Sequence, residues 1–125
     1  MALTLPSLVL DTNVALYHLG NRLGQPLPSG LYFVSIITEM ELLSYPGLSS
    51  TEAQQIHNFL SHLTIININD SIKNLAIQWR RQYKLKLPDA IIVATTLSLE
   101  ATLLTNDQQL IKIQDLPTQS IALSL

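Results

Sequence analysis

Short apolar runs alternate along the chain with longer segments in which apolar residues recur at helical spacing. The apolar runs resemble buried strands and predict five of them, the last at a sheet edge, at residues 8–10, 31–35, 64–68, 102–105 and 120–125. The longer segments predict helices at residues 13–19, 36–43, 50–63, 70–83, 88–99 and 108–113. A stretch rich in Gly and Pro at residues 20–30 predicts a loop.

Three of these helices have recognisable starts. Ser49 and Glu52 have the spacing of a capping box. Asp70 is the expected N-cap of the longest helix, whose core-facing stripe is Ile72, Leu75, Ala76, Trp79 and Tyr83. Pro88 suits the first turn of a helix that is apolar nearly all round, and so is expected to be buried, with Asp89 in its first turn.

The alternation of strands and helices predicts the fold class. It favours a three-layer α/β/α sandwich around a mostly parallel central sheet. The chain of 125 residues fits a single domain spanning 1–125. In such folds, sites form outside the carboxyl ends of the strands, so polar residues that directly follow strands are the first candidates for function.

The composition predicts a protein that works with a partner. Hydrophobic residues make up 47% of the chain and charged residues 13%, against about 25% charged in typical domains. Uncovered apolar surface usually marks a partner site, so we expect an obligate partner or a homodimer, with a monomer as the alternative. The chain lacks cysteine, a signal-peptide pattern and an apolar run long enough for a membrane span, so we expect a cytoplasmic protein without disulfides.

The charges are unevenly distributed. The net charge of -2 argues weakly against nucleic-acid binding, because phosphate contacts need Lys and Arg. However, five of the seven basic residues fall between positions 73 and 86. Four of them are candidates for holding an RNA backbone, with a solvated helix face as the alternative: Arg80, Arg81, Lys84 and Lys86.

Four acidic residues stand at positions that favour function. Asp11 directly follows the first predicted strand, Asp107 follows the fourth by two residues, and Glu41 and Asp89 lie in predicted helices. Each also has a structural interpretation, as a helix cap, a first-turn acid or a solvent-facing residue. Buried carboxylates need neutralising partners, and oxygen ligands favour Mg²⁺ or Mn²⁺. Three histidines lack metal-ligand spacing: His18, His57 and His62.

At four points the sequence resembles the motifs of PIN domains. The matching segments are residues 8–13 (LVLDTN), 35–43 (SIITEMELL), 87–95 (LPDAIIVAT) and 103–107 (LLTND). Their order and the chain's size are similar to those of bacterial VapC-type toxins. The resemblance implies a PIN-like fold, RNA cleavage with Mg²⁺ or Mn²⁺ held by Asp11, Glu41, Asp89 and Asp107, and an antitoxin protein as partner.

The second motif contains two candidate glutamates. Glu41 fits because Thr38 lies three residues before it and a leucine follows it, and Glu39 remains a competitor. Asn13 and Thr105 match supporting polar positions of the family. The resemblance implies hydrolysis by in-line attack of water on phosphorus, leaving a 5′-phosphate and a 3′-hydroxyl. This reaction does not need the RNA 2′-hydroxyl, so a preference for RNA must come from binding.

Two other functions compete with the nuclease. A non-catalytic PIN-like domain would keep the fold and bind RNA or protein. A phosphatase of the haloacid-dehalogenase type also places an Asp after its first strand, but it requires a second carboxylate two residues later, where this chain has Asn13. The lack of a G-x-G-x-x-G sequence argues against a dinucleotide enzyme.

Overall fold

The computed structural model describes residues 4–124, whose strands form one sheet with the order β3-β2-β1-β4-β5. The strands are β1 (Ser7–Leu10), β2 (Leu31–Ser35), β3 (Thr64–Ile66), β4 (Thr102–Leu104) and β5 (Thr118–Gln119). Every neighbouring pair is parallel. The central strand β1 therefore ends at the same edge of the sheet as its neighbour β4.

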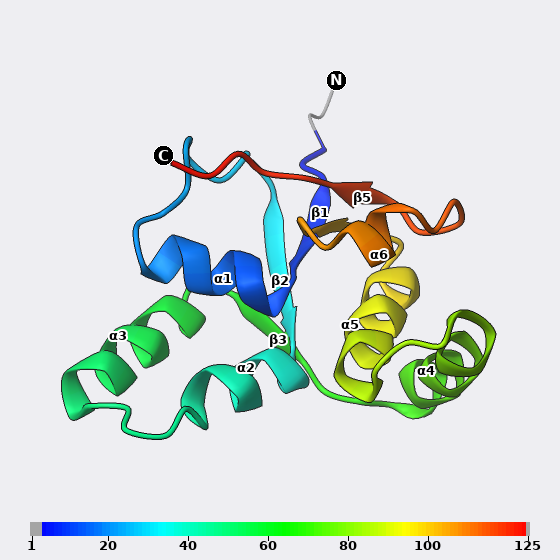
Figure 1. Ribbon diagram of the computed structural model, residues 1–125, viewed down its shortest axis with the longest axis horizontal. Coiled ribbons are helices and arrows are strands. Elements are labelled where there is room, and N and C mark those ends of the chain that lie inside the picture. Colours follow the sequence, from blue (N-terminus) through cyan, green and yellow to red (C-terminus); the bar gives the residue numbers. More distant parts are fainter. Residues whose placement is uncertain (1–3, 125) are drawn as a thin grey trace.

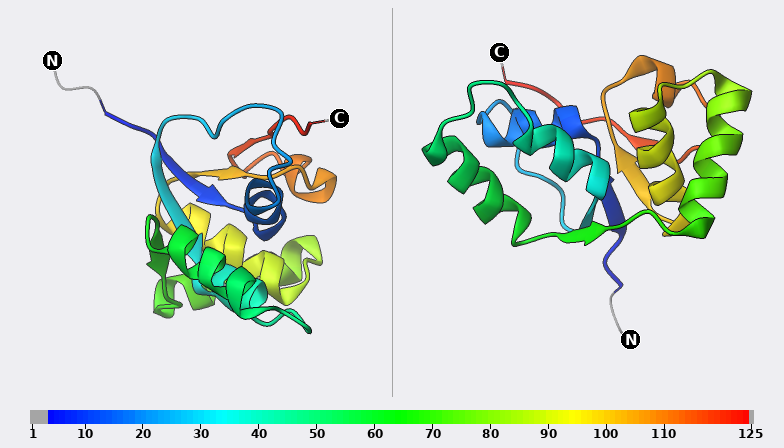
Figure 2. Two further views of the ribbon diagram at one scale, coloured as in Figure 1. Left: turned by 90° about the vertical axis from the view of Figure 1, so that its left-hand side faces the viewer. Right: turned by 90° about the horizontal axis from the view of Figure 1, so that it is seen from below.

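Helices cover both faces of the sheet (Figures 1 and 2). They are α1 (Thr12–Leu19), α2 (Ile36–Leu43), α3 (Ser50–Leu60), α4 (Asp70–Tyr83), α5 (Leu87–Ser98) and α6 (Gln108–Ile111). Helices α1, α2 and α3 lie on one side, and α4, α5 and α6 on the other. This is the predicted three-layer α/β/α sandwich. Within residues 4–124, no helix has both the length and the apolar character to cross a membrane.

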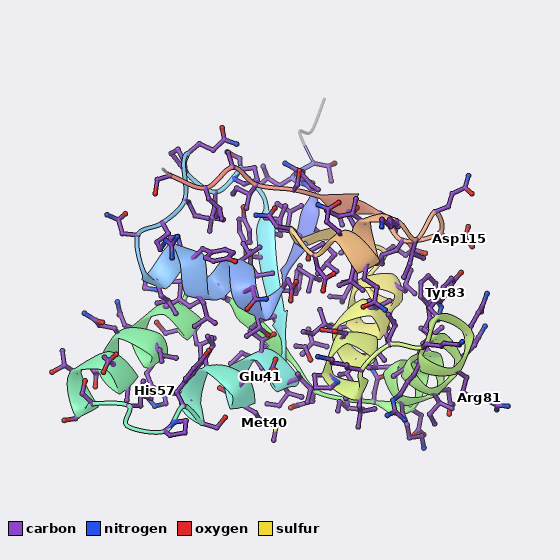
Figure 3. All side chains as sticks on the ribbon, viewed as in Figure 1. Met40, Glu41, His57, Arg81, Tyr83 and Asp115 are labelled. Carbon is purple, nitrogen blue, oxygen red and sulfur yellow. The ribbon has the colours of Figure 1, made fainter. Side chains whose placement is uncertain are left out.

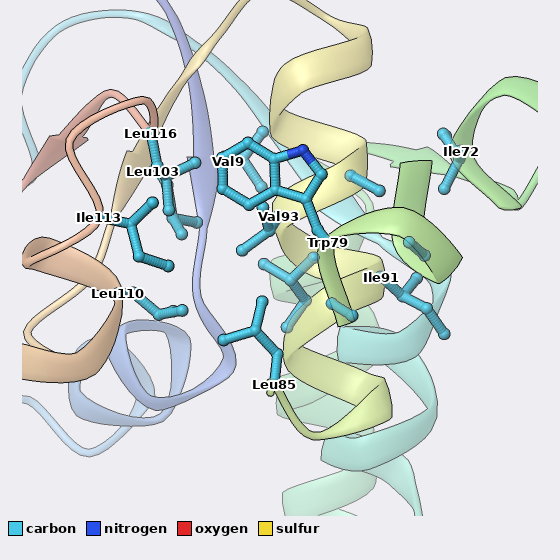
Figure 4. Packing of buried hydrophobic residues seen from close by; sticks show 14 of the residues in the cluster. Val9, Ile72, Trp79, Leu85, Ile91, Val93, Leu103, Leu110, Ile113 and Leu116 are labelled. Atoms are coloured by element: carbon cyan, nitrogen blue, oxygen red, sulfur yellow. The ribbon is translucent and has the colours of Figure 1, made fainter. Parts of the chain in front are cut away.

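The core consists of two apolar clusters, one on each face of the sheet. Successive side chains of β1 alternate between them, so that Val9 joins the cluster of α4 and α5 while Leu8 and Leu10 join the other. Side chains fill the space between helices and sheet (Figure 3), and Trp79 of α4 reaches into the cluster that also holds Val93 of α5 (Figure 4). Strands buried on both faces explain the continuous apolar runs in the sequence.

The predicted last strand at 120–125 is wrong. The edge strand is Thr118–Gln119, because the backbone of β4 pairs with residues 117–119 and not with residues 120–125. Leu103 N donates to Pro117 O and Thr105 N donates to Gln119 O, both at 3.0 Å. The next segment is held differently: the amide side chain of Asn106 bonds both N and O of Ile121 at 2.9 Å. Residue 125, included in the prediction, lies outside the described residues.

Helix starts largely follow the sequence signals. The capping box of Ser49 and Glu52 is present, and Pro88 lies in the first turn of α5. The predicted N-cap Asp70 is wrong by one residue, because the side chain of Asn69 accepts from Ile72 N at 2.8 Å and Asp70 is already helical. Helix α3 ends at Leu60 and β3 at Ile66, so both elements are shorter than predicted.

Candidate active site

The carboxyl ends of the neighbouring strands β1 and β4 bring Asp11 and Thr105 together. Leu10 of β1 pairs with Leu104 of β4, and Asp11 N donates to the carbonyl of Leu104 at 3.0 Å. The hydroxyl of Thr105 donates to Asp11 Oδ2 at 2.6 Å and accepts from Asp107 N at 3.0 Å. One threonine therefore connects two of the acids that sequence reasoning selected.

Asp11 occupies the N-cap position of α1 but does not act as a cap. Its side chain makes no capping hydrogen bond, and it is only 6% exposed. The interpretation of Asp11 as a simple helix cap therefore fails. Asp107 does cap its helix, since its Oδ1 accepts from Gln109 N at 2.8 Å, but its second carboxylate oxygen is not used by that bond.

Glu41 is held in place by a hydroxyl of the neighbouring helix. Thr12 follows Asp11 directly, and its Oγ1 lies 2.8 Å from Glu41 Oε1, to which it donates, and 3.0 Å from Thr38 Oγ1. Residues two apart on a helix lie about 200° apart around its axis. Glu39 accordingly has no place in the cleft that Glu41 lines.

Asp11, Glu41 and Asp89 line one open cleft of about 330 Å³. Asp89 enters it from the first turn of α5, where Pro88 starts the helix. The other polar or aromatic lining residues are Thr12, Asn13, Ser44 and Tyr45. Sequence reasoning selected Asn13, but missed Thr12 and Tyr45, because a single hydroxyl or ring carries no distinctive spacing.

The acids influence one another electrostatically. Burial is the main cause that raises the pKa of Asp11; hydrogen bonds from Thr105 and the Thr12 backbone oppose it, while Asp107 and Glu41 add to it. Burial likewise raises the pKa of Asp89, and the negative charges of Asp11, Asp107 and Glu41 raise it further. The structure therefore brings Asp11, Glu41 and Asp89 to one cleft, whereas Asp107 does not line it and acts on Asp11 and Asp89 only through its charge.

The donor set fits a hard divalent cation. Within residues 4–124 the ion pair Lys73–Asp70 is the only one, so none of the four acids is neutralised by a basic side chain at contact distance. Their ligand atoms are oxygens, as Mg²⁺ and Mn²⁺ prefer. No three acidic or histidine side chains in the same range are arranged to hold an ion as they stand. An ion would therefore have to draw these mutually repelling carboxylates together by side-chain rotation.

The family model of the PIN domain matches residues 8–116. The chain belongs to the PIN-domain family. The match includes all four acids. A comparison with curated proteins gives no significant match.

Solved structures similar to this PIN domain include several from toxin–antitoxin complexes. A chain of a toxin–antitoxin complex from Klebsiella pneumoniae is 30% identical, with a TM-score of 0.68, over 85% of this chain and 92% of that one. VapBC-1 from Haemophilus influenzae gives 25% identity and a TM-score of 0.73, over 91% and 97%. VapBC2 from Rickettsia felis, bound to a promoter DNA fragment, is 19% identical with a TM-score of 0.77, over 92% of this chain and 98% of that one. At this identity the similarity shows a shared fold.

The basic residues selected from the sequence do not all lie near the acids of this PIN domain. They are exposed: Arg80, Arg81, Lys84 and Lys86. Lys86 is the N-cap residue of α5, and its charge lowers the pKa of Asp89. Arg81 projects from the outer side of α4, far from Glu41 (Figure 3). Of the two, only Lys86 is therefore close enough to act on the acidic site.

Proposed function

We propose that this PIN domain is a metal-dependent endoribonuclease and the toxin of a VapBC-type pair. The observation that carries the proposal is the gathering of Asp11, Glu41 and Asp89 in one cleft, electrostatically coupled to Asp107 and without a cationic partner within residues 4–124. The similarity to a chain of the Klebsiella pneumoniae toxin–antitoxin complex supports the toxin assignment.

The four carboxylates would hold Mg²⁺ or Mn²⁺. When bound, such a cation neutralises phosphate charge and lowers the pKa of a coordinated water. Thr105 holds the Asp11 carboxylate through its 2.6 Å hydrogen bond, and Thr12 holds Glu41 at 2.8 Å. Fixed ligand orientation matters because mutation of a residue that hydrogen-bonds a metal ligand typically lowers metal affinity or activity by about 10- to 100-fold.

The substrate is an RNA phosphodiester. In the reaction, water attacks phosphorus, the bond from phosphorus to the 3′-oxygen breaks, and the products carry a 5′-phosphate and a 3′-hydroxyl. The exposed ammonium of Lys86 near Asp89 is suited to contact a neighbouring phosphate. The more distant Arg80, Arg81 and Lys84 would serve only for RNA that extends across α4.

The test compares Asp89→Asn with Asp115→Asn. Asp115 is exposed and lies far from Glu41 (Figure 3), so its variant controls for the loss of one acid. We expect Asp89→Asn to keep a wild-type circular dichroism spectrum, to lose most Mn²⁺ binding in calorimetry, and to lose RNA cleavage, while Asp115→Asn behaves as wild type. Undiminished cleavage by folded Asp89→Asn would contradict the assignment of Asp89.

A separate experiment addresses the partner. We expect a small protein encoded next to this chain to co-purify with it and to suppress RNA cleavage. If the wild-type protein binds neither Mg²⁺ nor Mn²⁺ in calorimetry, the function would instead be that of a non-catalytic PIN-like binding domain.

A further inference from the structure

Tyr45 differs from the other tyrosines of the chain. Its side chain is 52% exposed, and within residues 4–124 it has neither a side-chain hydrogen bond nor an aromatic or cation–π contact. The other three each have a partner: Arg22 beside Tyr17, the Pro28 carbonyl for Tyr32, and Trp79 packed against Tyr83. The ring of Tyr45 is therefore half exposed and has no such partner within residues 4–124.

The backbone of Tyr45 is fixed by a turn at the end of α2. Leu48 N donates to Tyr45 O at 3.3 Å, Pro46 follows Tyr45, and Gly47 has φ +77°. Proline in the second position and a positive φ in the third are the pattern of a type II turn. A ring on a fixed backbone loses less conformational freedom when a ligand binds to it.

The turn places Tyr45 beside the acids. Tyr45 lies two residues beyond the end of α2, the helix that carries Glu41. Accordingly, Tyr45 lines the cleft of about 330 Å³ together with Asp11, Glu41 and Asp89. It is the only aromatic residue that lines this cleft in the described part of the chain.

A nucleotide has two parts that match the two parts of this cleft. Its anionic phosphate suits a cation held by the carboxylates, and its flat, neutral base suits an exposed aromatic ring. We propose that Tyr45 is a substrate-recognition residue whose ring stacks on an unpaired nucleobase next to the cleaved bond. This inference rests on the proposed nuclease function and adds to it a residue that recognises the base beside the cut.

The requirement for a single strand follows from stacking itself. In a duplex, neighbouring base pairs cover both faces of every base, and double-stranded RNA is recognised mainly by its shape and backbone. The cleft volume of about 330 Å³ lies at the low end of the ~300–1,000 Å³ typical of ligand sites. A cleft of this size can hold a single nucleotide unit.

Tyr45 also borders a second, apolar hollow formed by α1, α2 and α3. That hollow is lined by several aliphatic side chains apart from Tyr45: Leu16, Leu19, Leu42, Leu48 and Ile56. It would keep its apolar character without Tyr45, whereas the acidic cleft would lose its only aromatic ring among the described residues. The observations therefore favour a nucleobase over a protein side chain as the partner of Tyr45.

The test measures cleavage and binding with three variants at Tyr45. Stacking of one base on an aromatic side chain changes affinity by about 5- to 150-fold. We expect Tyr45→Ala and Tyr45→Leu to raise KM for a short single-stranded RNA at least fivefold with kcat little changed. Tyr45→Phe, which keeps the ring, should remain within about twofold of wild type.

An RNA with one abasic nucleotide makes the test specific. In the wild type, removal of the base beside the cut should raise KM as much as Tyr45→Ala does, and in Tyr45→Ala it should have no further effect. Equal effects of base removal in both proteins would overturn the proposal. Annealing a complementary strand should abolish cleavage by the wild type, and efficient cleavage of the duplex would also contradict it.

Two further results separate this inference from the function on which it rests. If the wild type cleaves RNA and Tyr45→Ala cleaves equally well but binds the partner protein more weakly, Tyr45 serves the protein interface and the inference is wrong, while the nuclease assignment stands. Fluorescence anisotropy with the same RNA in Ca²⁺ tests stacking without cleavage. Equal affinities of wild type and Tyr45→Ala there would overturn the inference whatever the cleavage assay gives.

Discussion

At the scale of single residues, Asp11 is in electrostatic conflict with its surroundings. It is the only one of the four site acids that is buried, and burial raises its pKa. Thr105 is the one side chain, among the described residues, that donates a hydrogen bond to its carboxylate. The charged form of Asp11 is therefore less stable in the folded protein than in the unfolded chain unless a cation lies beside it.

This conflict predicts the pH dependence of stability. An acid whose pKa is raised by folding binds its proton more tightly in the folded state. Its contribution to stability is therefore fully present below its unfolded pKa of about 3.9 and is lost as the pH rises through its folded pKa. In EDTA at pH 7 we expect Asp11→Asn to melt a few degrees above the wild type. The difference should shrink as the pH is lowered toward 4.

Differential scanning calorimetry at several pH values would measure this difference. The asparagine can still accept the hydrogen bond from Thr105, so the comparison isolates the charge. A lower melting temperature for Asp11→Asn in EDTA at pH 7 would show that the carboxylate stabilises the fold without a metal.

Thr12 makes a second prediction at the same scale. Its hydroxyl lies 2.8 Å from Glu41 Oε1, and loss of such a partner typically weakens metal binding or activity by about 10- to 100-fold. We expect Thr12→Val to lose about tenfold in Mn²⁺ affinity, measured by calorimetry. Thr12→Ser keeps the hydroxyl and should bind nearly as the wild type does; equal weakening in both variants would indicate packing rather than the hydrogen bond.

The sequence predicts the acids of the site better than their supports. Asp11 directly follows β1, Asp107 comes three residues after the end of β4, and Asp89 lies in the first turn of an apolar helix, so topology alone brings them toward one edge. Thr12 and Tyr45 have no such signal. Their roles depend on which side chain lies opposite, and that is decided by the packing of α1 against α2.

At the scale of elements, the segment after β5 shows where pattern recognition fails. Residues 120–125 alternate polar and apolar side chains as an edge strand would, but β4 forms its ladder with residues 117–119. Which segment pairs with an edge depends on long-range geometry that the alternation does not encode. The buried strands and helices could be predicted from the sequence, because their apolar side chains must be shielded from water by the neighbouring layers.

Asn106 provides the test at this scale. Its side chain makes two hydrogen bonds with the backbone of Ile121, each 2.9 Å long. Leaving a partly buried backbone group unsatisfied costs about 1–3 kcal/mol, so we expect Asn106→Ala to lose roughly that much stability in urea denaturation. Hydrogen exchange at the Ile121 amide should become much faster, and an unchanged rate would contradict this role.

At the scale of the whole molecule, three of the nine acidic residues line one cleft, and the charge of a fourth, Asp107, acts on two of them. A ligand that binds only the folded state at 100 times its Kd stabilises it by about 2.7 kcal/mol. In a domain of this size that corresponds to roughly 5–15 °C in melting temperature. We expect saturating Mn²⁺ to raise the melting temperature by this amount, EDTA to reverse it, and Asp89→Asn to respond much less in calorimetric scans.

The C-terminal segment has a practical consequence for handling the protein. Leu123 forms a bridge with Leu23, Ser124 N donates to Arg22 O at 2.8 Å, and Ile121 binds the residue next to Asp107. Truncation at position 120, or a bulky fusion at this end, would loosen both the loop after α1 and the strand end that carries Asp107. Expression vectors should therefore carry the affinity tag at the other end.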